Sequence, residues 1–117
     1  MLAAMKKTFL LALGLGLAAA AGAADHKVIA LSLVKGEVRD VKDNTVRVKK
    51  GDDVELRWTS DRAATLHLHG YEVEAKLVPG KASTMSFNAK YPGRFPVHEH
   101  AEGQANHRPV LYLEVYP

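Results

Sequence analysis

The amino-acid sequence predicts an all-β protein, an antiparallel Greek-key β-sandwich of about seven or eight short strands. Three observations favour this fold class. Apolar and polar residues alternate with period two along most of the chain after residue 24. Turn-forming Gly, Pro, Asp and Asn residues separate the alternating stretches. No window of about a dozen residues in this part of the sequence has the period of an amphipathic helix.

The expected strands follow one another in short steps. Each has one apolar face for the core, as in Val54, Leu56 and Trp58, which alternate with polar residues. Trp58 is therefore expected to pack in the core. The strands are expected within residues 28–34, 36–40, 46–49, 54–58, 66–69, 85–87, 95–97 and 111–115. Turns are expected at Asp43-Asn44, Gly51-Asp52, Pro79-Gly80 and Pro92-Gly93.

The first 24 residues have the organisation of a secretory signal peptide. Lys6 and Lys7 provide a positive segment, residues 8–20 are uncharged and rich in Leu and Ala, and small residues follow. The apolar segment is shorter than the about 20 residues that span a bilayer. We expect cleavage after Ala23 or Ala24, delivery to the bacterial periplasm, and a single mature domain of residues 25–117 without a membrane anchor.

Charge and composition exclude several classes of partner and cofactor. Lys6 and Lys7 are two of the 16 basic residues, so the mature chain would carry 14 against 13 acidic residues, a net charge of about +1. Nucleic acid is not expected as a partner, because the basic residues are interspersed with acidic ones. The absence of Cys excludes disulfides, Cys-ligated zinc, iron–sulfur clusters and thiolate copper centres.

The six histidines hold the clearest chemical signal. His67 and His69 form one His-x-His pair, and His98 and His100 form another. Successive side chains of a strand point to opposite faces, so the two members of each pair share a face. The four imidazoles would converge if the two strands were neighbours, and imidazole suits copper, zinc and nickel. An isolated surface histidine is usually only solvated, but two such pairs in a short chain predict a metal site.

The sequence resembles the cupredoxin-like domain, the small β-sandwich of copper proteins, over essentially all of the mature chain. Residues 46–58 resemble the family's strand–turn–strand signature, and Leu-His-Leu-His-Gly-Tyr at 66–71 resembles its His-bearing strand. Pro-Gly-Arg-Phe-Pro-Val-His-Glu-His at 92–100 resembles the strand that leads into the C-terminal ligand loop, and residues 111–115 resemble the final strand. The resemblance implies that His107, in that loop, joins the ligands.

The departures from the family pattern are informative. Blue-copper members have a Cys where this chain has Glu99, and an axial Met often follows the loop histidine; neither is present here. The resemblance therefore implies a copper protein without blue-copper electron transfer. The motifs His67-Leu68-His69-Gly70 and His98-Glu99-His100 are also similar to the His-x-His-Gly and His-Cys-His of multicopper oxidases, whose histidine pairs serve a copper cluster between domains. This second resemblance implies that a homo-oligomer could complete a site between subunits.

Glu99 and His26 each have more than one interpretation. Glu99 could be a metal ligand, could orient a ligand imidazole, or could form a salt bridge with an Arg such as Arg94 or Arg108. Cleavage after Ala23 would make His26 the third mature residue. A free amine, two amides and that imidazole would then give a square-planar site for copper(II) or nickel(II). Cleavage one residue later would destroy this arrangement.

The expected function is that of a periplasmic copper-binding protein in copper storage, delivery, sequestration or resistance. Copper(II) is the expected ion, with zinc as the alternative, and a copper-handling protein is a candidate partner. Metal affinity should fall as imidazoles protonate below about pH 6.5. Two alternatives stay open: a small copper enzyme with an open histidine site, although no catalytic residue stands out, and a metal-free β-sandwich binding module. The candidate ligands are His67, His69, His98, His100 and His107, with Glu99 and His26 as further candidates.

Overall fold

The computed structural model describes residues 25–100 and 108–117. Within them the chain forms nine β-strands and one short 3-10 turn, which confirms the all-β prediction. No helix in these two ranges has the length and the hydropathy needed to cross a membrane. The elements are β1 His26–Val34, β2 Glu37–Arg39, η2 Lys42–Asn44, β3 Thr45–Lys49, β4 Asp53–Ser60, β5 Ala64–Leu68, β6 Val73–Leu77, β7 Ser83–Asn88, β8 Gly93–His100 and β9 Pro109–Tyr116.

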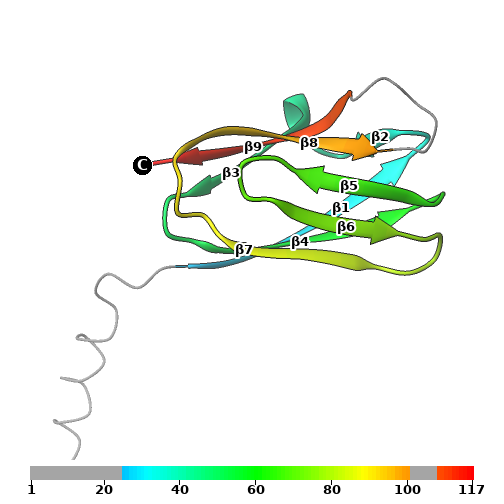
Figure 1. Ribbon diagram of the computed structural model, residues 1–117, viewed down its shortest axis with the longest axis horizontal. Helices are drawn as coiled ribbons and strands as arrows, with labels where there is room; N and C mark the ends of the chain where they lie inside the picture. Colours follow the sequence, from blue (N-terminus) through cyan, green and yellow to red (C-terminus); the bar gives the residue numbers. More distant parts are fainter. Residues whose placement is uncertain (1–24, 101–107) are drawn as a thin grey trace, which may run out of the picture.

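Two sheets stacked on each other make the sandwich (Figure 1). One sheet has four strands in the order β2-β1-β4-β7, and the other has five in the order β3-β9-β8-β5-β6. In the five-stranded sheet β5 therefore lies directly beside β8. This pairing brings the two His-x-His pairs close together, because β5 carries His67 and is followed directly by His69, and β8 carries His98 and His100.

The core lies between the sheets and is filled by the apolar face of each strand. In β4 the buried apolar side chains are Val54, Leu56 and Trp58, each separated from the next by a more exposed residue. Trp58 is fully buried, as its alternation predicts, and its Nε1 has no hydrogen-bond partner within the described residues. Each large apolar side chain that leaves water contributes about 1.5–3 kcal/mol, so this alternation is a main source of stability.

Two strand pairs differ from the expected antiparallel arrangement. β1 runs parallel to β4, and β3 runs parallel to β9. Parallel neighbours need a long connection, and each of these pairs is separated in the chain by other strands. Period-two alternation reveals which face of a strand is buried but says nothing about the direction of the neighbouring strand. The sequence pattern therefore could not distinguish these pairs from antiparallel ones.

One strand, β6, was not expected from the sequence. Its residues alternate between Val73, Ala75 and Leu77 on one face and acidic or basic residues on the other. Ala, Glu and Lys are all depleted in strands, so the segment carries a weak strand signal of its own. Pairing with β5 along its whole length and burial of Ala75 and Leu77 stabilise it at the edge of the sheet.

Candidate metal centre

The pairing of β5 with β8 brings the two His-x-His pairs onto one surface. His67 lies directly opposite His98, and Thr65 lies directly opposite His100. Residues directly opposite each other in an antiparallel pair project to the same face. Since Leu66 is fully buried in the core, its neighbour His67 projects from the outer face of the five-stranded sheet. The histidine pairs therefore come together on the outer face of the five-stranded sheet, away from the core.

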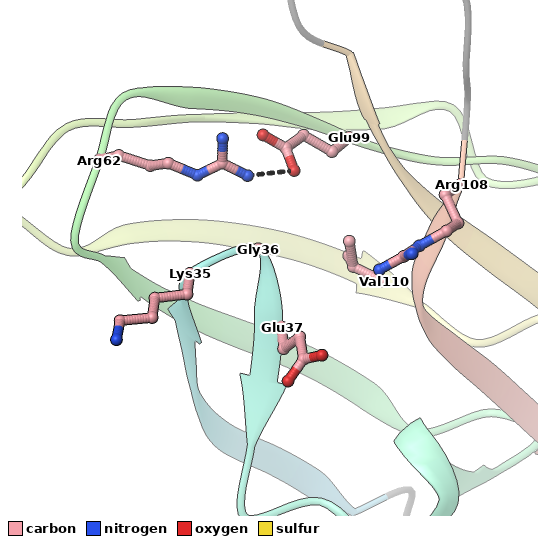
Figure 2. A pocket seen from close by; sticks show the side chains of 7 residues that line it. All are labelled: Lys35, Gly36, Glu37, Arg62, Glu99, Arg108 and Val110. Atoms are coloured by element: carbon pink, nitrogen blue, oxygen red, sulfur yellow. Dashed lines mark hydrogen bonds and ion pairs between the residues drawn. The ribbon is translucent and has the colours of Figure 1, made fainter.

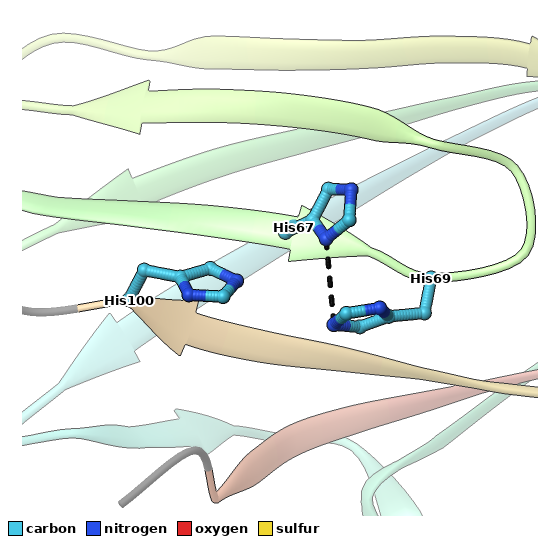
Figure 3. Close-up of side chains that lie close together, drawn as sticks. All are labelled: His67, His69 and His100. Carbon is cyan, nitrogen blue, oxygen red and sulfur yellow. Dashed lines mark hydrogen bonds between the residues drawn. The ribbon is translucent and has the colours of Figure 1, made fainter. Parts of the chain in front are cut away.

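Three of these imidazoles form a compact group (Figure 3). His67, His69 and His100 each offer a ring nitrogen, and the three nitrogens lie within 4.8 Å of one another. His67 Nδ1 is 3.3 Å from His69 Nε2. The rings themselves are close, with 4.3 Å between the centroids of His67 and His69 and 5.6 Å between those of His67 and His100. All three side chains are only partly exposed to solvent.

His98 adjoins the group through His69. Its Nδ1 lies 2.9 Å from His69 Nε2, and the two ring centroids are 4.5 Å apart. His69 Nε2 thus stands within hydrogen-bonding distance of nitrogens from two other histidines. All four members of the two His-x-His pairs therefore lie in one cluster, with His69 at its centre.

Two of the nitrogen separations in this cluster match those of ligands on one metal ion. Two nitrogens bound to one ion at about 2.0–2.1 Å lie about 2.8–3.4 Å apart when the angle at the ion is between a right angle and a tetrahedral angle. The separations of 3.3 Å and 2.9 Å around His69 Nε2 fall within that range. A donor set made only of imidazoles also suits the metals that the sequence predicts, copper and zinc.

A tight turn after β5 holds His69 in the cluster. The His69 backbone N–H donates to the Pro96 carbonyl at 3.0 Å, so the chain stays against β8 for one residue beyond the strand. Gly70 then adopts a φ of +93°, and a Cβ added there would lie 2.3 Å from Cδ1 of Phe95. Only glycine avoids both the backbone strain and this clash. The order His69-Gly70 therefore follows from the geometry of the turn.

Glu72, in the same turn, contacts the cluster and was not singled out from the sequence. Its Oε1 lies 3.1 Å from His67 Nε2, and its Oε2 accepts a hydrogen bond from the Gly70 backbone N–H at 3.1 Å. The signal that could have revealed it is a carboxylate placed three residues after a His-x-His pair, within reach of a candidate ligand imidazole. Alternation along strands, which guided the choice of candidates, does not extend into turns.

Glu99 lies on the opposite face of β8 from the histidines. It is paired with the buried Leu66, its side chain is only 13% exposed, and its Oε1 accepts a hydrogen bond from Arg62 Nη2 at 2.7 Å. Of the three roles open from the sequence, this geometry matches a salt bridge, with Arg62 as the partner in place of Arg94 or Arg108. Arg94 instead lies beside Glu114, with Nη1 3.6 Å from its Oε2.

The Arg62–Glu99 pair lies in a charged pocket of about 270 Å³ (Figure 2). Basic and acidic side chains from several segments line it, so a carboxylate there has ionic surroundings rather than purely apolar ones. The lining residues are Lys35, Gly36, Glu37, Arg62, Glu99, Arg108 and Val110.

Two further candidates are not part of the cluster that the structure describes. His26 opens β1 in the four-stranded sheet, and its Nε2 lies 2.7 Å from Glu55 Oε2. The backbone atoms that would complete an amino-terminal site include those of Ala24, which lies outside the described residues. His107, expected in the C-terminal ligand loop, also lies outside the described residues. Both remain predictions.

Tyr71 supports the turn from its other side. Its hydroxyl donates to the Tyr91 carbonyl at 2.7 Å and accepts from the Tyr91 backbone N–H at 2.9 Å. The ring contacts Phe87 and Phe95, both at 5.0 Å between centroids. Burial, with a smaller contribution from the neighbouring Tyr91, raises the pKa of Tyr71 above its ordinary value of 10.0, although the hydrogen bond from the Tyr91 backbone opposes the shift. Tyr71 thus stabilises the turn that contains Gly70 and Glu72 by linking it to Tyr91 and to the aromatic rings of Phe87 and Phe95.

No protein-family model matches the sequence, and no curated protein resembles it closely enough to count as a relative. Solved structures resemble it in fold. The periplasmic domain of subunit II of cytochrome oxidase from Bradyrhizobium japonicum superposes with a TM-score of 0.61 at 15% identity, covering 75% of this chain and 82% of that one. Copper nitrite reductase from Nitrosomonas europaea superposes with a TM-score of 0.61 at 22% identity, covering 80% and 42%.

A multi-copper oxidase from Pseudomonas thermotolerans has a TM-score of 0.60 at 21% identity, covering 80% of this chain and 30% of the oxidase. The chain thus spans less than half the length of the oxidase and of the nitrite reductase. The sandwich of two sheets and these likenesses confirm the fold that the sequence motifs suggest: the chain has a cupredoxin-like fold, and it has no Cys.

Proposed function

We propose that this protein binds copper in the periplasm and serves in copper storage, delivery, sequestration or resistance. The observation that carries the proposal is the convergence of ring nitrogens from His67, His69 and His100 within 4.8 Å of one another. His98, whose Nδ1 lies 2.9 Å from His69 Nε2, is the nearest source of a fourth ligand among the described residues. His107 is a further candidate from the loop that follows β8.

Copper(II) is the ion that this donor set favours. Affinity for nitrogen ligands rises along the first-row divalent ions to a maximum at copper(II) and falls at zinc, which is the alternative ion. No thiolate or thioether stands in the cluster, so nothing in it selects copper(I). The likenesses to structures described as multi-copper oxidase and copper nitrite reductase support copper as the ion. When bound, the ion would be held by imidazoles that β5, β8 and the turn after β5 position.

The periplasm is proposed from two independent observations. Residues 1–24 have the organisation of a secretory signal peptide, with Lys6 and Lys7 before an apolar segment. The likeness to the periplasmic domain of a cytochrome oxidase subunit supports the same compartment. N-terminal sequencing of the exported protein tests the signal peptide directly, and cleavage after Ala23 would also create the amino-terminal site that involves His26.

The position of the cluster bears on its partners. Because the histidines project from the outer face of a sheet, an approaching protein could reach the ion without opening the core. A copper-handling protein is one such partner, and a second copy of this chain that completes the coordination is the other. Metal affinity measured above and below the concentration at which subunits dissociate tests the second copy, because an intrachain site keeps its stoichiometry and affinity in the monomer.

The alternatives differ in what they require of the site. A small copper enzyme would need an open coordination position and a turnover reaction, and a metal-free binding module would need no ion at all. Elemental analysis of protein isolated from the periplasm rules out the metal-free module if copper is present. An activity screen of the copper-loaded protein then distinguishes a binding protein from an enzyme.

A copper titration of the wild type and of four single variants tests the proposal. His67→Ala, His69→Ala and His100→Ala should each weaken copper(II) binding strongly, whereas His26→Ala, on the other sheet, should leave the cluster site intact. If His26→Ala lost tight copper binding and the other three variants kept it, the copper site would lie at the amino terminus. Wild-type affinity in all four variants would contradict both sites.

A further inference from the structure

The carboxylate of Glu72 is held at both of its oxygens. Oε2 accepts the backbone N–H of Gly70 at 3.1 Å, and Oε1 lies 3.1 Å from Nε2 of His67. The first contact fixes the carboxylate relative to the turn, and the second links it to the histidine cluster. A side chain that is 70% exposed would otherwise have many conformations open to it. The two contacts therefore define one position for the carboxylate.

The backbone at Glu72 is also unusual. Its φ is +54°, in the left-handed region that residues with a Cβ seldom adopt. Glycine would fit this backbone without strain, as Gly70 does two residues earlier. Lys35, Asp40, Asp43 and Asn44 have similar backbone angles in other turns. What distinguishes Glu72 is that its side chain reaches the histidine cluster.

The contact with Glu72 favours one nitrogen of His67 as a metal ligand. In a neutral imidazole one nitrogen carries the proton and the other has the free lone pair, and an ionised carboxylate can only accept a hydrogen bond. Oε1 of Glu72 lies 3.1 Å from Nε2 of His67, so a neutral His67 that carries its proton on Nε2 would face the carboxylate with it and keep the lone pair on Nδ1. Nδ1 is the nitrogen that faces His69 Nε2 at 3.3 Å, inside the cluster.

We propose that Glu72 is a positioning residue of the copper site: it fixes His67 as the Nε2–H tautomer and aims Nδ1 at the ion. This inference rests on the proposed function for its consequence, copper affinity, but its structural part concerns the metal-free protein. A hydrogen-bonded carboxylate behind a ligand imidazole orients the ring and makes it a stronger base toward the metal. The cluster would then bind through Nδ1 of His67 and Nε2 of His69.

The expected size of the effect follows from the exposure of Glu72. Removing such an outer partner costs about 10- to 100-fold in metal affinity in general. Because water screens and competes for an exposed carboxylate, we expect a loss near the lower end, about tenfold in copper(II) affinity.

Two variants of Glu72 separate positioning from closing the turn. Glu72→Gly relieves the left-handed backbone, so the fold should remain at least as stable in thermal unfolding while the carboxylate is lost. Glu72→Gln keeps one acceptor oxygen but cannot accept from both Gly70 and His67, so it should lie between wild type and Glu72→Gly. The matched control is Glu74→Gln, since Glu74 is exposed on β6 directly opposite His67 and makes no described contact with its ring.

The readout is nitrogen-15 NMR of the histidine rings, recorded without metal and after addition of zinc, together with competition titration of copper(II). Without metal, the wild type and Glu74→Gln should show His67 as the Nε2–H tautomer, and Glu72→Gly should show a mixture of tautomers. With zinc, the metal-induced shift in the wild type should appear at Nδ1 of His67. Copper(II) affinity should fall about tenfold in Glu72→Gly and stay within about twofold in the control.

Failure of this inference can be told apart from failure of the proposed function. If the wild type binds neither copper nor zinc, the proposed function is wrong, and the tautomer of His67 in the metal-free protein still decides whether Glu72 positions the ring. If the metal binds but Glu72→Gly keeps both the affinity and the Nε2–H tautomer of the wild type, the positioning role is refuted. An equal loss of affinity in Glu74→Gln would likewise refute it, since the effect would then be one of surface charge.

Discussion

The two faces of strand β8 have opposite chemistry. On the outer face His98 and His100 lie beside the imidazole of His69, in the turn after β5, whereas on the inner face Glu99 forms an ion pair with Arg62. By the family resemblance, Glu99 stands where a blue-copper domain has its Cys. On the inner face the charge of Glu99 is balanced by that of Arg62. On the outer face the histidine side chains lie close to one another. The two faces of one strand can therefore differ completely: the inner face of β8 bears an ion pair at Glu99, and its outer face bears the candidate ligands.

The strongest test of the outer face is to remove its central ring. His69→Ala deletes the nitrogen that lies within 3.3 Å of both His67 Nδ1 and His98 Nδ1. We expect copper(II) affinity to fall by more than about 100-fold, beyond the usual cost of losing an outer partner of a ligand. Competition titration measures the loss, and the thermal unfolding of the metal-free variant should stay close to wild type. If the copper(II) affinity of the variant stayed within about tenfold of wild type, His69 would not be a main ligand of the ion.

The turn that presents His69 can be broken without touching a histidine. Gly70→Ala places a Cβ 2.3 Å from Phe95 Cδ1 and forces a side chain onto a φ of +93°. Overpacking and left-handed strain together should lower the free energy of unfolding by about 2 kcal/mol or more. Chemical denaturation of the metal-free protein measures this loss, and copper affinity should fall with it because His69 is displaced. Wild-type stability would mean that the turn adjusts around the new methyl group.

On the inner face, removing the partner of Glu99 should affect stability and leave copper binding alone. Arg62→Ala leaves a carboxylate that is 13% exposed without its 2.7 Å hydrogen bond. The pair is partly exposed on the Arg side, so we expect a loss of about 1 kcal/mol in unfolding free energy.

Glu99→Gln completes this test of the inner face. Copper(II) affinity should change by less than about twofold, because the carboxylate lies on the other side of β8 from the cluster. A tenfold loss of copper(II) affinity would instead indicate that Glu99 is a metal ligand, and the two faces of β8 would then share one site.

The smallest expected effect concerns the tyrosine that fastens the turn. Because the pKa of Tyr71 is raised by burial, the folded protein holds the protonated phenol more tightly than the unfolded chain does. The stability linked to this proton is fully present below about pH 10 and is lost as the pH rises from there through the raised pKa. In Tyr71→Phe the unfolding free energy should be lower near neutral pH, by about 1 kcal/mol for the lost hydroxyl. As the pH rises above about 10, the unfolding free energy should fall less steeply in Tyr71→Phe than in the wild type. Equal slopes would show that groups other than Tyr71 cause the loss of stability at alkaline pH.

The sequence predicts the faces of strands better than their neighbours. Alternation correctly assigns Trp58 and Leu66 to the core and places His67 on the opposite side from Leu66. It does not report which strands run parallel, since direction depends on contacts between residues distant in the chain. Motif resemblance supplied the fold where local pattern could not, and the adjacency of β5 and β8 follows from that fold.

The unforeseen parts of the candidate site lie in turns. Arg62 follows β4 and Glu72 follows β5, and neither position belongs to an alternating stretch. Their contacts depend on backbone angles, such as the φ of +54° at Glu72, that a residue other than glycine gives no reason to expect. The secretory signal at residues 1–24, the role of His107 and the amino-terminal site at His26 stay predictions.

A crystal structure of the copper-loaded protein tests the central claim most directly. We expect one copper ion on the outer face of the five-stranded sheet, about 2 Å from ring nitrogens of His67, His69 and His100, with the Arg62–Glu99 pair unchanged. An ion bound to Glu99 on the inner face, or an ion held only near His26 while the cluster of imidazoles stays empty, would contradict it.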